Sequence, residues 1–326
     1  PSPPTQLIMT QRRVVSLLPS ATEIVCCVGA VDQLVGVSHE CDHPPGVAGR
    51  PILTQARMHA ASGSLAIHRS VQDALQDALA IYTVDREKLA ELAPDVIVTQ
   101  DLCDVCAVSF AEVCAAIETW LDHKATVVSL QPQRLGDIWE DIRRTGAALN
   151  REAEAKQAVD ALLARVEAVR EVAAHQGTRP KVVTLEWIEP PMLGGLWMAE
   201  LIALAGGSPL GHGPGEKSRV STQAELEALD PDVVVIKPCG FTLEQTRPEL
   251  ARVQEAIPTW TQWTAVREDR VFVADGNAYF NRPGPRIVDS LEILAASLHP
   301  EAFGHLRDRY PNAVQRWRPD GTLEPW

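Results

Sequence analysis

The segment Leu92-Ala93-Pro94-Asp95-Val96-Ile97-Val98 recurs, little changed, as Leu229-Asp230-Pro231-Asp232-Val233-Val234-Val235 in the second half of the chain. Two further apolar runs recur in the same order, residues 13–17 as residues 181–185 and residues 125–129 as residues 269–273. Continuous β-branched runs of this length are typical of strands buried on both faces of a parallel sheet. The repeat therefore predicts an α/β fold of two similar, Rossmann-like lobes.

A long helix is predicted between the two repeats. Residues 149–176 contain neither Pro nor Gly, and their apolar residues follow helical spacing, at Val159, Leu162, Val166, Val169 and Ala173. Asn150 is the expected N-cap, Gly177 the expected C-terminal stop, and Glu152 with Lys156 an i,i+4 pair. At 1.5 Å per residue the helix would be about 40 Å long, enough to join both lobes and to allow them only small relative motion.

These patterns divide the chain into four predicted parts. They are an N-terminal α/β lobe at 12–148, a connecting helix at 149–177, a C-terminal α/β lobe at 178–300 and a C-terminal tail at 301–326.

Composition excludes several classes of protein. The 326 residues include 30 Lys plus Arg against 43 Asp plus Glu, a formal net charge of −13 that repels a phosphate backbone and argues against nucleic-acid binding. No run approaches the roughly 18 apolar residues of a membrane-spanning helix, so we expect a protein that is not membrane-embedded. We also expect a monomer.

The seven cysteines and the first residues bear on the cellular compartment. An odd number of Cys, including the adjacent Cys26 and Cys27, does not resemble a disulfide framework. Residues 1–6 show no basic region followed by an apolar one. These observations predict a cytoplasmic protein; the alternative is a periplasmic one whose signal peptide has been removed.

The loops that follow the predicted strands carry the candidate binding residues. Ligands of open α/β sheets collect at the carboxyl ends of the strands, and two facing lobes would bring these loops into one cleft between them. Flat aromatic side chains there suit a large planar ligand, and Arg282 suits a carboxylate or phosphate. The candidates are Glu186, Trp187, Trp197, Tyr279, Phe280 and Arg282 in the second lobe, and His39, Glu40 and Asp101 in the first.

Thiols and imidazoles on two loops of the first lobe raise the possibility of a metal centre. Cys41, Cys103, Cys106, His39 and His43 are the ligand types that zinc or iron takes. The alternative is that these thiols are packing residues and the histidines loop anchors. Ser20 and Glu23 have the spacing of a capping box at the start of a helix. We find no nucleophile elbow, phosphate loop or metalloprotease motif, and we expect no enzyme.

The residues resemble a known family. Residues 14–23 and 34–38, together with residues 39–45, 101–106 and 279–286, resemble class III substrate-binding proteins of ABC transporters, in the branch usually called cobalamin-binding proteins. That family carries cobalamin, iron siderophores and haem. The resemblance covers nearly everything from Arg13 to Pro300. It implies two lobes, one ligand between them, and an acidic residue on each lobe that docks on a membrane permease, with Glu23 a candidate in the first lobe.

The resulting expectation is a non-enzymatic protein that holds a cobalamin-like corrinoid between its lobes, as the substrate-binding component of an ABC importer. The alternatives are a metal-centred protein with a Cys/His site, and a siderophore or haem carrier.

Overall fold

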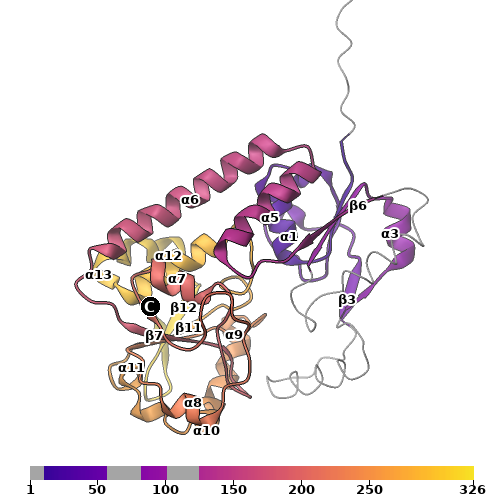
Figure 1. The fold of residues 1–326 in the computed structure, drawn as a ribbon. Coiled ribbons are helices and arrows are strands. Elements are labelled where there is room, and N and C mark those ends of the chain that lie inside the picture. Colours follow the sequence, from indigo (N-terminus) through magenta and orange to yellow (C-terminus); the bar gives the residue numbers. More distant parts are fainter. Residues whose placement is uncertain (1–10, 57–81, 101–124) are drawn as a thin grey trace, which may run out of the picture. The chain divides into compact units, whose positions relative to one another are not determined.

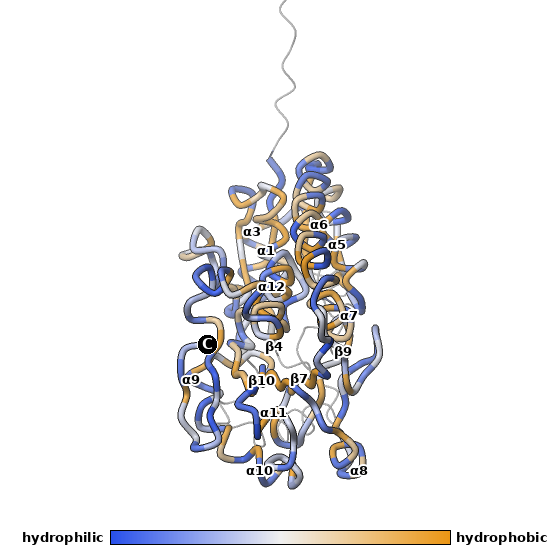
Figure 2. The backbone as a smooth tube through the Cα atoms, turned by 90° about the vertical axis from the view of Figure 1, so that its left-hand side faces the viewer, coloured by the Kyte–Doolittle hydropathy of each residue, from blue (hydrophilic) through white to orange (hydrophobic). Residues whose placement is uncertain are grey.

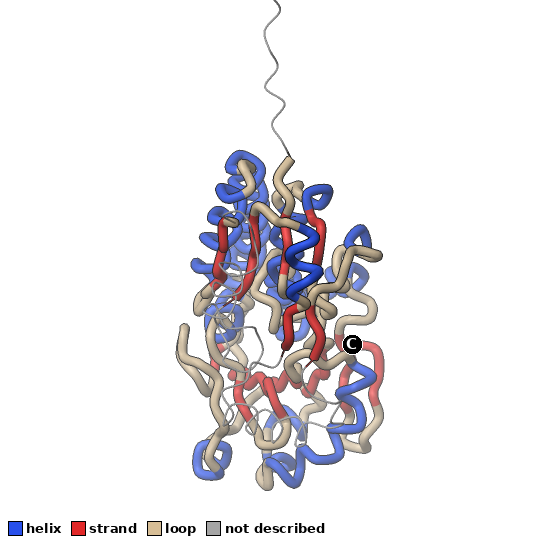
Figure 3. The backbone as a smooth tube through the Cα atoms, turned by 90° about the vertical axis from the view of Figure 1, so that its right-hand side faces the viewer, coloured by secondary structure: helices blue, strands red, loops and turns tan. Residues whose placement is uncertain are grey.

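The computed structural model describes residues 11–56, 82–100 and 125–326 (Figure 1). The described residues form two compact units. Unit 1 comprises residues 11–56, 82–100, 125–130 and 143–155, and unit 2 comprises residues 131–142 and 156–326. In each unit, strands are flanked by helices (Figure 3).

Unit 1 is built on a parallel sheet with the strand order β2-β1-β5-β6. Its apolar core contains Val15, Leu17, Leu53 and Ile97. The strands are β1 (Val14–Ser16), β2 (Leu34–Gly36), β5 (Val96–Gln100) and β6 (Thr126–Leu130), with β3 (Thr54–Ala56) and β4 (Tyr82–Val84) as a separate antiparallel pair. The helices are α1 (Pro19–Cys27) and α3 (Arg86–Leu92), with short 3-10 turns at Val31–Gln33 and Pro45–Val47.

Unit 2 is built on a seven-stranded mixed sheet with the order β13-β12-β11-β10-β7-β8, in which β9 also pairs with β7. The strands are β7 (Lys181–Trp187), β8 (Met192–Leu193), β9 (Ser208–Pro209), β10 (Val233–Ile236), β11 (Val271–Ala274), β12 (Val314–Trp317) and β13 (Leu323–Pro325). The helices are α7 (Met198–Leu204), α8 (Gln223–Glu227), α9 (Leu243–Thr246), α10 (Val253–Ala256), α11 (Thr264–Arg267), α12 (Ile287–Leu298) and α13 (Pro300–Phe303). The 3-10 turns are Arg247–Arg252, Trp260–Gln262 and Gly304–Arg309.

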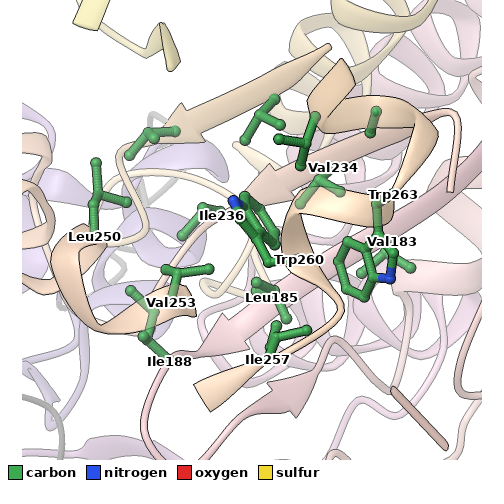
Figure 4. Close-up of a cluster of buried hydrophobic side chains, with 14 of the residues drawn as sticks. Val183, Leu185, Ile188, Val234, Ile236, Leu250, Val253, Ile257, Trp260 and Trp263 are labelled. Atoms are coloured by element: carbon green, nitrogen blue, oxygen red, sulfur yellow. The ribbon is translucent and has the colours of Figure 1, made fainter. Parts of the chain in front are cut away.

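Tryptophan fills the core on one face of this sheet. Trp260 and Trp263 lie against Leu185, Ile236 and Val183, and their rings are 5.3 Å apart (Figure 4). The hydrophobic helix α12, of which all but one residue is buried, belongs to the same unit (Figure 2). Two of the eight tryptophans of the chain therefore serve to pack this core.

Both units use the repeated Pro-Asp-Val segment in the same way. The carboxylate Oδ2 of Asp95 accepts a hydrogen bond from the backbone N–H of Arg13 at 2.8 Å, and that of Asp232 accepts one from Lys181 at 2.7 Å. In each case the aspartate joins the starts of two neighbouring parallel strands, β1 with β5 and β7 with β10. The predicted repeat and the predicted α/β fold of two lobes are confirmed. The aspartate recurs in both segments because its carboxylate joins the starts of two strands.

The predicted connecting helix is present, although its caps differ from the prediction. α6 runs over Glu152–Ala174 after α5 (Leu135–Ala148), about 34 Å at 1.5 Å per residue. Asn150 has a left-handed φ of 55° and ends α5: its N–H donates to the carbonyl of Ala147, and that of Arg151 to the carbonyl of Gly146. The prediction of Asn150 as an N-cap is wrong, because this motif closes the preceding helix.

Side chains of α6 also pair differently from the prediction. Lys156 pairs with Asp160, not with Glu152. Farther along, Arg165 Nε lies 2.9 Å from Glu292 Oε1 on α12. Tyr310 donates to Glu292 Oε2 at 2.6 Å, so this buried carboxylate ties α6 to α12 and to the residues before β12.

Helix α1 begins two residues earlier than a capping box with Ser20 as N-cap would require. Leu18 is its N-cap, Pro19 is its first residue, and no side chain of the described residues caps it. Ser20 and Glu23 are buried, at 2% and 3% exposure, and Ser20 Oγ has no hydrogen-bond partner in the part of the chain that the structure describes. The capping-box prediction is therefore wrong, and the burial of Glu23 does not fit a docking contact on the surface.

Among residues 11–56, 82–100 and 125–326, no helix has the length and apolar character needed to cross a membrane. The chain after Pro300 forms α13, the last 3-10 turn and strands β12 and β13, which extend the sheet of unit 2 in antiparallel fashion.

Candidate functional site

The order of strands changes direction beside β7 in the sheet of unit 2. β8 and β9 pair with one side of β7, and β10 pairs in parallel with the other side. Ligands of open α/β sheets bind beyond the carboxyl ends of the strands at such a switch point. The residues at this point are Glu186 and Trp187 at the end of β7 and Lys237 directly after β10.

A fully buried ammonium group lies at the switch point. Lys237 has 0% exposure, and its Nζ donates to Glu186 Oε2 at 3.2 Å and to Asn281 Oδ1 at 2.7 Å. A buried charge is tolerated only when it is paired and hydrogen-bonded, and these two acceptors fulfil that need. Asn281 also donates to the carbonyls of Lys237 and Gly276, which fixes the loop after β11 to the end of β10.

Glu186 is held by a second neighbour. Ser218 Oγ donates to Glu186 Oε2 at 3.0 Å and accepts from the backbone N–H of Gly195 at 2.9 Å. A Cβ atom at Gly195 would lie 2.5 Å from the carbonyl oxygen of Glu216, so only glycine allows these two loops to approach so closely. The carboxylate of Glu186 is thus oriented by three elements: a strand end and two loops.

An aromatic pair adjoins this polar group. The rings of Trp187 and Phe241 meet edge to face with centroids 5.3 Å apart, and both residues are half-buried. Trp187 Nε1 is buried and has no hydrogen-bond partner among the described residues. Cys239, which follows β10 by three residues, is exposed, and its backbone N–H donates to the carbonyl of Glu186.

Two predicted site aromatics are buried. Trp197 is 6% exposed, and its Nε1 donates to the carbonyl of Phe280 at 2.8 Å. Phe280 is 1% exposed, has a φ of 68°, and its N–H donates to Ser290 Oγ. Their contacts are those of core residues that fix the loop between β11 and α12, so we leave both rings out of the site proposed below.

The predicted residues after β11 lie in one loop with different surroundings. Tyr279 is half-buried, with the Arg286 guanidinium 5.8 Å from its ring centroid and the ring of Tyr310 at 6.1 Å. Arg282 is 7% exposed and donates to Asn277 Oδ1 at 2.9 Å. Tyr279 therefore presents part of its ring, whereas Arg282 is turned to the protein.

In unit 1, the predicted residues near the ends of β1 and β2 belong to a network of hydroxyl groups. His39 Nδ1 lies 2.7 Å from Thr54 Oγ1, which donates to Ser38 Oγ. Cys41 Sγ lies 3.0 Å from Thr22 Oγ1. His39 and Glu40 are exposed, and His43 is half-buried.

No group of three His, Cys, Asp or Glu side chains arranged to hold a metal ion occurs within the described ranges. Asp101, Cys103 and Cys106 lie outside those ranges, so the predicted zinc or iron site stays a prediction.

Sequence reasoning missed Lys237, Asn281, Ser218 and Phe241. A signal for Lys237 was available: this lysine directly follows four β-branched residues, and the corresponding run of the same repeat, residues 181–185, is followed by Glu186. Asn281 and Ser218 carry no such signal, because their roles depend on loop conformation.

Residues 14–278 match the family model described as periplasmic binding protein. The chain belongs to this family. A curated relative, the uncharacterized ABC transporter substrate-binding lipoprotein YvrC of Bacillus subtilis, is 23% identical over 298 residues, which cover 90% of this chain and 81% of the relative.

Solved structures share the class III fold. A periplasmic haem-binding protein from Pseudomonas aeruginosa matches with a TM-score of 0.66 and 20% identity over 89% of this chain and 94% of its own. The periplasmic vitamin B12-binding protein BtuF of Vibrio cholerae matches with a TM-score of 0.62 and 20% identity over 88% of this chain and 96% of its own. At these identities the likeness shows the fold and leaves the ligand open. The protein is thus a substrate-binding protein of the ABC transporter class, which implies a small-molecule ligand and a permease.

The prediction of a cytoplasmic protein is wrong. The family is one of periplasmic binding proteins, and the Bacillus relative is a lipoprotein. The thiols do not oppose export: burial, followed by the charge of Glu23, raises the pKa of Cys26 and of Cys27 to about 11. Protonated thiols react slowly with oxidants, so free cysteines of this kind are compatible with an oxidising compartment.

Proposed function

We propose that the protein binds a cobalamin-like corrinoid and delivers it to the permease of an ABC importer. The supporting observation is the combination, at the switch point of unit 2, of the Trp187–Phe241 aromatic pair with the oriented carboxylate of Glu186. A corrin ring is broad and apolar on its faces and carries primary amides at its rim. It can therefore pack on aromatic side chains and donate hydrogen bonds to a carboxylate.

Tyr279 contributes further apolar surface in this proposal, from the loop after β11. His39 and Glu40 are exposed at the corresponding edge of unit 1 and remain predicted ligand contacts, as does Asp101. The protein's part in transport is to bind and to release; no covalent step is needed.

A haem carrier is the second candidate, and Tyr279 favours it. A tyrosine phenolate is one of the side chains that hold haem iron, and the Arg286 guanidinium over the Tyr279 ring would stabilise negative charge there. Arg286 would also suit a propionate.

Titration of the purified chain with cyanocobalamin, followed by calorimetry and by tryptophan fluorescence, tests the first candidate. We expect saturable binding, with Kd raised roughly tenfold or more in Trp187→Ala and in Phe241→Ala. Trp326→Phe, which alters a tryptophan at the C-terminus, is the control and should bind as the wild type does.

Titration with haemin, followed by its absorption spectrum, tests the second candidate. Saturable binding of haemin, changed in Tyr279→Phe, without binding of cyanocobalamin would overturn the corrinoid assignment in favour of haem.

A further inference from the structure

The two carboxylate oxygens of Glu186 differ in their hydrogen bonding. Both hydrogen bonds that its carboxylate accepts, from Ser218 Oγ and from Lys237 Nζ, end on Oε2. Oε1 accepts no hydrogen bond from any described residue, and the side chain is 26% exposed. An acceptor is therefore held in a fixed orientation and left available to solvent at the switch point.

The positive partner of this carboxylate cannot reach a ligand. Lys237 has no exposed surface, and its ammonium group is enclosed by Glu186 and Asn281. A ligand at the edge of the sheet thus meets the carboxylate oxygen and not the ammonium. A hydrogen-bond donor would satisfy Oε1, whereas a ligand carboxylate would place two acceptors of like charge in contact.

We propose that Glu186 is a specificity-determining residue that requires a neutral hydrogen-bond donor, such as a primary amide or a hydroxyl, at this point of the ligand and rejects a carboxylate there. The proposal rests on the proposed function, since it concerns the same site, and it narrows the substrate class. Lys237, Ser218 and Asn281 act as positioning residues, because each holds the carboxylate or its counter-ion.

The test uses the peripheral monocarboxylic acids of cyanocobalamin, in each of which one rim amide is replaced by a carboxylate of nearly the same shape. Calorimetry with the wild-type chain should show that at least one of these isomers binds roughly ten- to hundredfold more weakly than cyanocobalamin. In Glu186→Gln that penalty should largely disappear. Equal binding of every acid to the wild type, or an undiminished penalty in Glu186→Gln, would overturn the proposal.

Glu189→Gln is the matched control. Glu189 follows the same strand, but its carboxylate pairs with Arg252 at 3.2 Å, so this variant should keep the full penalty. Because Glu186→Gln leaves the buried Lys237 with Asn281 alone, the double variant Glu186→Gln/Lys237→Met is included; it removes both charges and should also lose the penalty.

A failure of the proposed ligand is distinguishable from a failure of this inference. If the wild type binds haemin and not cyanocobalamin, the corrinoid assignment fails, and the inference is tested by comparing haemin with the derivative in which its propionates are primary amides. The ratio of the Kd for haemin to the Kd for the amide should be larger in the wild type than in Glu186→Gln; an unchanged ratio overturns the inference. If neither ligand pair binds, both proposals are overturned.

Discussion

Asn281 holds Lys237 at two points: its Oδ1 accepts from the ammonium Nζ at 2.7 Å, and its Nδ2 donates to the Lys237 carbonyl at 3.1 Å. One side chain therefore both satisfies a buried charge and fixes the backbone that carries it. Replacing it by alanine removes an acceptor that no solvent can replace, because Lys237 is fully buried.

Asn281→Ala should lower the free energy of unfolding by about 2–3 kcal/mol, the usual cost of losing a hydrogen bond to a charged group. Urea denaturation followed by circular dichroism measures it. Asn312→Ala, at an exposed position, is the control and should change stability little. An Asn281→Ala variant as stable as that control would show that Lys237 needs no fixed acceptor.

Trp197→Phe separates a structural role from a ligand contact. The indole N–H satisfies the buried carbonyl of Phe280, so its loss should cost about 1–3 kcal/mol of stability. Because the Trp197 ring is buried, the Kd for cyanocobalamin should stay within about twofold of the wild-type value. A Kd raised tenfold in a folded Trp197→Phe protein would instead restore Trp197 to the ligand site.

Acid should weaken the junction between α6 and α12. Burial alone would raise the pKa of Glu292, but hydrogen bonds from Arg165 and Tyr310 and the positive charges of Arg165 and Arg309 outweigh it, so the pKa is lowered from its ordinary 4.5. A carboxyl group with a lowered folded-state pKa contributes stability that is fully present above its unfolded pKa and is lost as the pH falls through the folded one.

Glu292→Gln should therefore be less stable than the wild type near neutral pH, and its stability should fall less steeply between about pH 6 and about pH 3. Urea midpoints across this range provide the measurement, with the exposed Glu301→Gln as control. Parallel curves for Glu292→Gln and the wild type would contradict a stabilising role for the ionised carboxylate.

Cys26 and Cys27 should alkylate slowly. Burial, with a smaller contribution from Glu23, raises their pKa from 9.0 to about 11, so the thiolate fraction near pH 8 falls roughly a hundredfold. Iodoacetamide labelling, read peptide by peptide by mass spectrometry, should show both far behind the exposed Cys239. In urea the difference should vanish; rapid labelling of Cys26 in the folded protein would contradict its burial.

Much of the fold followed from the sequence, for a local reason. All six repeated apolar runs contain strands that pair with one another in parallel, because a continuous β-branched run buries both of its faces. Helix ends were predicted less well. Asn150 suits an N-cap and a left-handed C-terminal position equally, and the motif that decides between them involves backbone groups three and five residues apart.

The site was predicted only in part. Tyr279 lies in the loop after β11 as expected, whereas Glu186 and Trp187, expected in a loop, are the last two residues of strand β7. Trp197 and Phe280 are buried. Loop position places a backbone, but the direction of a ring depends on packing contacts such as that between Trp197 and Phe280, which are 83 residues apart. Asn281 and Ser218 were missed for the same reason.

The aspartate that opens β5 and its counterpart before β10 separate two tasks within one scaffold. The amino-terminal margins of both sheets are committed to strand register, so mutation there is constrained by folding. The opposite margin of the sheet of unit 2 carries Glu186, Trp187 and the loop around Asn281, which belong to the proposed site and take no part in joining the strand starts. If that site holds the cargo, a change of cargo would leave untouched the aspartates that set which strands begin side by side.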